Sequence, residues 1–180
     1  MASVARDDEV YDDAQFQLAC IADRRGELAR KDPSRLAESE DYYEEASRLL
    51  ARLIKDHGQV PHYRGEMVAA LCGRAGVHLA AARLPDAQRD CEAALDHLAR
   101  LIGEQVRKGA PENPQYLSLL GRVQARLSQI HQLQGRPEAC RRAREQAVEK
   151  LSRAVQLDPA RAADRARLER LQTHPARWVE

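Results

Sequence analysis

Histidine and cysteine are the side chains of this sequence that could bind a metal ion or act as a nucleophile. The 180 residues include six histidines and four cysteines, but no HxxxH, HExxH or CxxC pattern. Zinc sites usually draw ligands from such short spacings. We therefore predict no metal site, and we expect free thiols that pack as small apolar side chains. The cysteines are Cys20, Cys72, Cys91 and Cys140.

Motifs for phosphate binding and acid–base catalysis are also missing from the sequence. None of GxxxxGKS, GxxxxGKT and GxGxxG occurs, so no glycine-rich loop is encoded that would hold a nucleotide phosphate. Carboxylate pairs such as Glu44 and Glu45 stand in no apolar segment that would raise a pKa for proton transfer. We expect neither catalysis nor a bound cofactor.

Arginines gather toward the C-terminal end, and a basic cluster is the usual electrostatic mark of a nucleic-acid-binding surface. Acidic residues stand three or four positions from many of them, and no aromatic residues are interleaved that could stack on bases. Surface salt bridges therefore explain the cluster better than a nucleic-acid partner does. Its members are Arg136, Arg141, Arg142, Arg144, Arg153, Arg161, Arg165, Arg167 and Arg170.

Apolar residues are too scattered for a membrane segment. The sequence contains no stretch of about 18 uninterrupted apolar residues, the length that spans a bilayer. The first residues, MASVARDDEVYDD, are acidic and lack the apolar centre of a secretory signal. We therefore expect no membrane association and a cytoplasmic location.

Charge changes sign along the chain although the formal net charge is only +1. Residues 1–60 carry 9 basic and 14 acidic side chains, a net of −5, and residues 61–120 are balanced. Residues 121–180 carry 13 basic and 7 acidic side chains, a net of +6. Two explanations stay open: a drifting composition of the solvated surface, or complementary ends that steer self-association.

The elements that would position these residues repeat along the sequence. Pro33, Pro85 and Pro137 are each 52 residues apart, and Tyr11, Tyr63 and Tyr116 follow one another at 52 and 53. A fixed period of this kind indicates an array of like units. Prolines fit the first turn of a helix, and apolar residues recur between them at three- and four-residue intervals. We predict helices over residues 8–30, 36–56, 61–82, 86–108, 114–134, 137–157 and 160–172.

The expected fold is all-α, since aromatic residues, which favour sheets, make up only 4% of the chain. We predict one domain of three antiparallel helical hairpins, over about 8–56, 61–108 and 114–157. A C-terminal helix at about 160–172 would cap this solenoid with one narrow apolar stripe, leaving a loose tail at 173–180. A closed bundle of the same helices is the alternative.

Residues 61–98 resemble a tetratricopeptide repeat (TPR). The first helix carries Leu71, Ala75 and Leu79, and the second carries Ala87, Cys91, Ala94 and Leu95. Residues 114–159 repeat the pattern, with the turn GRPEA and the closing LDP. The long second helices and the Pro-x-Tyr opening are most similar to the extended arrays beside protein-kinase domains in some bacteria. The turns depart from the family: its glycine is Ala82 or Arg83 in the middle unit, and the third turn looks one residue short.

This resemblance implies a right-handed superhelix whose first helices line a concave surface for a peptide or a partner protein. The small, apolar middle unit and polar outer units suit a ligand with an apolar centre. Core packing of the middle residues is the alternative. By repeat alignment the groove residues are Gln17, Cys20, Arg24 and Glu27 in the first unit, Cys72, Gly76 and Leu79 in the second, and Gln124, Ser128 and His131 in the third.

The functional hypothesis is a non-catalytic interaction module or scaffold that binds a peptide or a partner protein in this groove. Two alternatives stay open. The chain could self-assemble into a homo-oligomer through its oppositely charged ends, or it could be the regulatory module of a larger kinase-type system.

Overall fold

A computed structural model of the chain describes residues 2–58 and 60–173, with side chains from residue 10 onward. Helical segments make up 87% of the described residues, and no strand occurs among them. This confirms the all-α prediction. The α-helices are α1 (Ala2–Ala29), α2 (Leu36–Asp56), α3 (Pro61–Ala80), α4 (Leu84–Arg107), α5 (Pro114–Leu133), α6 (Pro137–Leu157) and α7 (Ala162–Thr173), and a 3-10 turn, Pro33–Arg35, precedes α2.

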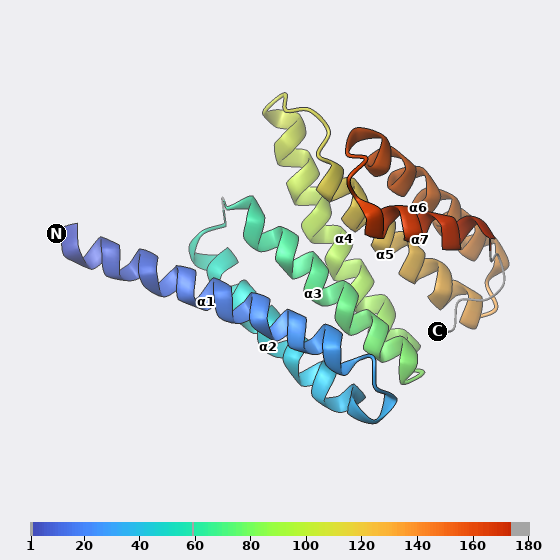
Figure 1. Ribbon diagram of the computed structural model, residues 1–180, viewed down its shortest axis with the longest axis horizontal. Coiled ribbons are helices and arrows are strands. Elements are labelled where there is room, and N and C mark those ends of the chain that lie inside the picture. Colours follow the sequence, from blue (N-terminus) through green and yellow to red (C-terminus); the bar gives the residue numbers. More distant parts are fainter. Residues whose placement is uncertain (1, 59, 174–180) are drawn as a thin grey trace.

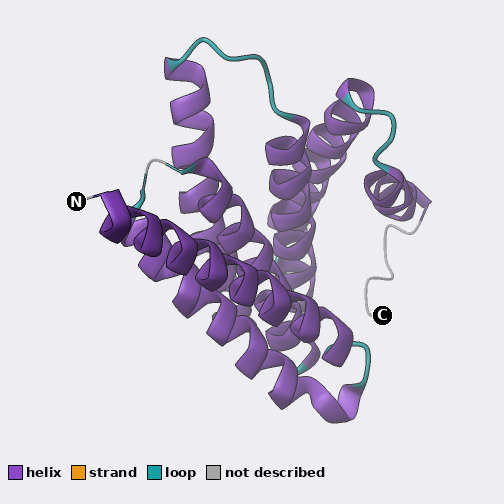
Figure 2. Ribbon diagram, turned by 60° about the vertical axis from the view of Figure 1, so that its left-hand side comes forward, coloured by secondary structure: helices purple, strands orange, loops and turns teal. Residues whose placement is uncertain are grey.

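Each helix packs against the next one along the chain. The most extensive contacts join α1 to α2, α3 to α4 and α5 to α6, and further contacts connect α1 to α3 and α3 to α5. Figure 1 shows these pairs following one another from α1 and α2 on one side to α6 and α7 on the other. Figure 2 shows short loops within the pairs and a longer one between α4 and α5.

The predicted helix boundaries agree with the structure except at the N-terminal end. The spans 36–56 and 137–157 are confirmed, and most other ends differ by one or two residues. The predicted start at residue 8 is wrong, because α1 begins at Ala2 and neither proline nor glycine interrupts its first 24 residues. Of the tail expected at 173–180, Thr173 ends α7 and residues 174–180 lie outside the described part.

The apolar core lies between the helix pairs. Its largest cluster joins Leu50 of α2, Val68 of α3, Leu98 of α4 and Val123 of α5, each at most 1% exposed. The four cysteines are free thiols. Cys72 and Cys91 are buried as expected, whereas Cys20 and Cys140 are only half-buried.

A chain of charged and polar side chains joins α2, α3 and α4. The guanidinium of Arg74 donates to both carboxylate oxygens of Asp90, with its shortest contact at 2.6 Å. The ring of His78 lies between Asp90, at 3.2 Å from Nδ1, and Glu40, at 3.1 Å from Nε2. Glu40 also pairs with Arg83. Since both ring nitrogens face carboxylates, we interpret this network as a structural link between helices.

The turn between α3 and α4 contains the one described residue other than glycine that has a positive φ, Ala82 at 57°. Gly135, at φ 66°, holds the equivalent place between α5 and α6. The turns have the same closing bonds, from the N–H of Arg83 to the carbonyl of His78 and from the N–H of Arg136 to the carbonyl of His131. Both turns have three residues, so the third turn is no shorter than the middle one.

Replacing Ala82 with glycine should raise the free energy of unfolding by about 0.5–1 kcal/mol, because glycine adopts a positive φ without a clash of Cβ. The matched exchange Gly135→Ala should lower it by about 1 kcal/mol. No atom lies within 4 Å of the position that a Cβ on Gly135 would take, so backbone conformation dominates the effect. Urea denaturation measures both changes, and a destabilising Ala82→Gly would contradict the left-handed turn.

Candidate functional site

A groove of about 680 Å³ opens between α1, α3, α5 and α7. The first helix of each helix pair lines it, and α7 lines its far side. Tyr43 of α2 is the only described lining residue from a second helix of a pair. The groove therefore combines side chains from segments far apart in the sequence.

Small side chains of α3 leave room for the groove. Ala69 follows Gly65 by four residues, and Cys72 and Gly73 follow Ala69 by three and four, so all of them share one helix face that lines the groove. The half-buried Glu66 is the charged exception on this face. A face of this kind leaves space that larger residues would fill.

The ring of Tyr43 lies between two glycines, one on α1 and one on the face of α3 that lines the groove. A Cβ on Gly73 would lie 2.3 Å from Cε1 of Tyr43, and a Cβ on Gly26 of α1 would lie 3.0 Å from Cε2. Tyr43 is only 2% exposed. Burial raises the pKa of its hydroxyl, and nearby Asp23 raises it further, so the hydroxyl stays neutral at physiological pH.

The side of the groove formed by α1 and α3 contains a crowded carboxylate. Burial raises the pKa of Asp23 to about 6, and the neighbouring Glu66 acts in the same direction. Arg122, across the groove, lowers the pKa of Asp23 less strongly. Burial and these two carboxylates also raise the pKa of the Cys20 thiol, which disfavours a reactive thiolate.

The side formed by α5 and α7 is basic. Arg122 and Arg126 stand one turn apart on α5, and Arg167 lines the groove from α7. Burial, together with the positive charges of Arg122 and Arg126, lowers the pKa of Arg167 to about 10. The carboxylate of Asp164 is buried, and one of its oxygens is 3.3 Å from Nη1 of Arg167. It also accepts hydrogen bonds from Ser118, at 2.8 Å, and Arg161, at 2.6 Å.

Three of the ten residues that the sequence assigned to the groove line it. Arg24 and Glu27 do so from α1, and Cys72 does so from α3. Gln17 is exposed and Cys20 is half-buried on α1, and neither is among the lining residues.

Gly76 and Leu79 of α3 pack inside the molecule. Gly76 is buried, and a Cβ there would lie 2.7 Å from Nη2 of Arg126. Leu79 packs against the main apolar cluster. For these two residues the structure agrees with the alternative reading as packing positions.

The residues assigned on α5 also lie outside the groove. The hydroxyl of Ser128 donates to the carbonyl oxygen of Cys140 on α6, at 3.2 Å. Nδ1 of His131 is 3.4 Å from the Gln134 amide oxygen, and Gln124 is half-buried. The face of α5 that meets the groove is instead the one with Ser118 and Arg122.

The sequence interpretation missed the charged residues Asp23, Glu66, Arg122, Arg126 and Arg167, which all line the groove. Two signals pointed to the pair on α5. The lining positions 65, 66, 69, 72 and 73 of α3 recur 53 residues later as 118, 119, 122, 125 and 126 of α5. Moreover, Arg122 and Arg126 have no acidic residue three or four positions away, whereas most arginines farther along the chain do.

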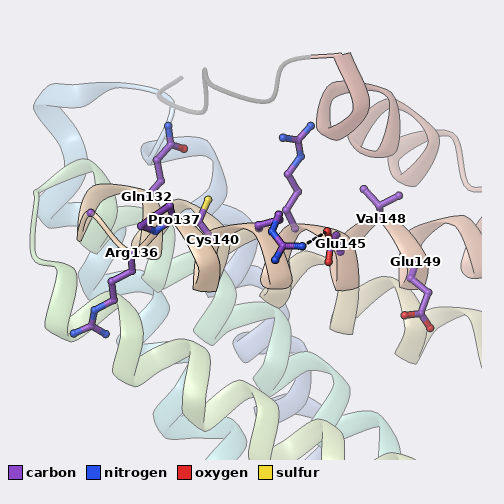
Figure 3. A pocket seen from close by; sticks show the side chains of 10 residues that line it. Gln132, Arg136, Pro137, Cys140, Glu145, Val148 and Glu149 are labelled. Carbon is purple, nitrogen blue, oxygen red and sulfur yellow. Dashed lines mark hydrogen bonds and ion pairs between the residues drawn. The ribbon is translucent and has the colours of Figure 1, made fainter.

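A second hollow, of about 760 Å³, follows the outer face of α6. Figure 3 shows Cys140 and Val148 along this helix, with Pro137 at its start. Its described lining comes from α6 and the end of the α5–α6 hairpin alone, and its Arg141 is already paired with Glu138, at 2.6 Å, and Glu145, at 3.2 Å. We therefore place the candidate site in the four-helix groove.

Neither a metal cluster nor a membrane-spanning helix occurs among the described residues. No group of three or more His, Cys, Asp or Glu side chains there is placed to hold a metal ion. None of the described helices is long and apolar enough to cross a membrane.

Comparisons with known proteins identify no relative of this chain. No protein-family model matches it, and neither a curated protein nor a solved structure does.

The raised pKa of Asp23 predicts a pH dependence of stability. Protonation of a carboxyl with a raised folded-state pKa favours folding, so this contribution is present at low pH and is lost as the pH rises through about 6. Asp23→Asn should therefore raise the free energy of unfolding by about 1–3 kcal/mol at pH 7 and by much less near pH 4.5.

Urea denaturation of both proteins across this pH range measures the difference. Glu27→Gln, which alters an exposed carboxylate of the same groove, should change stability by no more than about 0.5 kcal/mol. An Asp23→Asn variant less stable than the wild type at pH 7 would mean that the carboxylate is well paired.

Proposed function

We propose that this chain is a non-catalytic interaction module of the tetratricopeptide type, a solenoid that binds a peptide or a partner protein in its groove. The observation that carries the proposal is the groove itself, which α1, α3, α5 and α7 line together. Clefts formed by several packed helices are common sites for extended or helical peptides. The resemblance of residues 61–98 and 114–159 to the repeat family supports the same function.

Peptide selection tests this proposal with the whole chain as the target. Peptides are selected from a random displayed library, and their affinities are measured by fluorescence anisotropy. Ala69→Trp places a bulky ring on the groove floor, and Ala163→Trp places one at its α7 side. Each should weaken binding at least about tenfold, because the ring occupies the space of the ligand.

The matched control is Ala99→Trp, which adds the same ring to an exposed position of α4 away from the groove. Its affinity should equal that of the wild type. Circular dichroism shows whether each variant remains folded. Selected peptides that bind the groove variants as tightly as the wild type would contradict the proposal, as would failure to select any binder.

End-to-end association of copies is a second candidate function, and an exposed apolar stripe on α1 favours it. Val10, Tyr11, Leu18, Ile21 and Leu28 are 49–70% exposed. Their spacing places them along one face of the helix. The net charge of −5 on residues 1–60 and +6 on residues 121–180 makes the basic end of a second copy the occupant that fits this face.

Light scattering over a range of salt and protein concentrations tests this association. Complementary charges should make assembly weaken as salt increases. Ile21→Lys removes an apolar contact and adds repulsion toward a basic end, so it should give a monomer under conditions in which the Ala99→Lys control still assembles. A wild-type monomer at every salt and protein concentration would exclude this function.

A further inference from the structure

The basic side of the groove contains two arginines that have no partner of opposite charge among the described residues. Arg122 and Arg126 form no ion pair with any described residue, and Arg126 bonds only to the amide oxygen of Gln129, at 3.0 Å. In contrast, Arg74 is paired with Asp90, and Arg141 with two glutamates. The groove therefore holds two half-buried guanidinium groups that no described carboxylate neutralises.

The nearby carboxylates do not neutralise Arg122 and Arg126. Asp164 is already bonded to Ser118, Arg161 and Arg167. Asp23 lies across the groove, near enough to interact electrostatically with Arg122 but not within ion-pair distance. Seven arginines and four carboxylates line the described groove, which leaves it with a net positive charge of three.

The like charges also affect one another. Arg122 and Arg126 contribute to the lowered pKa of Arg167, whose side chain is 30% exposed. Repulsion between partly buried cations is relieved when an anion binds among them. Since the arginines come from α5 and α7, the anion would lie between two helices of the groove.

We propose that the partner of this groove is a phosphorylated segment of another protein, whose phosphate is bound by Arg122, Arg126 and Arg167. This inference rests on the proposed function of the groove as a peptide-binding site. A carboxylate has two oxygens, which one guanidinium fork can satisfy, whereas a phosphate monoester has three terminal oxygens and a charge of about −1.5 to −2. A phosphate therefore supplies enough oxygens and enough charge to meet three guanidinium groups better than a single carboxylate does.

The acidic side of the groove gives the segment a direction. Asp23 and Glu66 would repel a second anion and attract a basic side chain. The phosphate therefore lies toward α5 and α7, and a lysine or arginine of the partner lies toward α1 and α3.

Three peptide libraries test the proposal. They share degenerate flanks and have phosphoserine, serine or glutamate at the centre, and their binding to the full chain is measured by anisotropy at about 150 mM salt. The phosphoserine library should bind at least about tenfold more tightly than either of the others. Equal binding of the glutamate library would overturn the phosphate assignment, and equal binding of the serine library would overturn any anion site.

The matched variants separate local recognition from overall charge. Arg122→Gln with Arg126→Gln should reduce phosphoserine binding to the level of serine. Arg141→Gln with Arg153→Gln removes the same charge from α6, outside the groove, and should leave the preference intact. Loss of preference in both double variants would show non-specific charge attraction and would overturn the site.

Thermal unfolding gives a second measurement that needs no peptide. Inorganic phosphate at about 10 mM, compared with chloride at the same ionic strength, should raise the Tm of the wild type but not that of the Arg122→Gln, Arg126→Gln variant. The same shift in both proteins would contradict the site. If serine peptides bind and Ala69→Trp blocks them while phosphate has no effect, the groove function stands and this inference fails.

Discussion

The close approach of α1, α2 and α3 around Tyr43 is the constraint on which the groove depends. The ring fills the space that a Cβ on Gly73 would need, and it touches Gly26 on the other side. Any larger residue at Gly73 would push the rigid ring, and with it α2, away from α3. The same close approach keeps the floor of the groove narrow and places Asp23 and Glu66 near each other at its side.

A similar contact holds the second half of the molecule together. A Cβ on Gly121 of α5 would lie 2.6 Å from Cγ of Leu151 and 3.3 Å from the carbonyl oxygen of Ala147, both on α6. Between the two halves, Gly76 of α3 faces the flexible end of Arg126 rather than backbone. Arg126 can therefore change rotamer to meet a ligand while the apolar core that joins α3 and α4 to α5 stays packed.

Much of this arrangement could be predicted from the sequence, and the predictions that differ from the structure do so for physical reasons. Period and proline positions locate the helices, and the 53-residue interval relates the groove positions of α3 to those of α5. The same interval fails for α1, whose groove residues Asp23 and Glu27 stand 43 and 42 residues before Glu66 and Ala69 of α3. Sequence spacing alone does not show how α1 packs on α3, so the 52-residue period predicts Gln17 and Cys20 instead.

The fold places the acidic and basic ends of the sequence on opposite sides of the groove. The acidic first third supplies Asp23 and Glu27 to one side of the groove, and the basic last third supplies Arg122, Arg126 and Arg167 to the other. The opposite charges face each other across the groove without forming ion pairs with one another. Burial is the main cause of the raised pKa of Asp23 and of the lowered pKa of Arg167, and like charges on the same side of the groove add to both shifts. Charged groups left uncompensated inside a groove cost folding free energy, and such costs are typical of sites that bind a ligand.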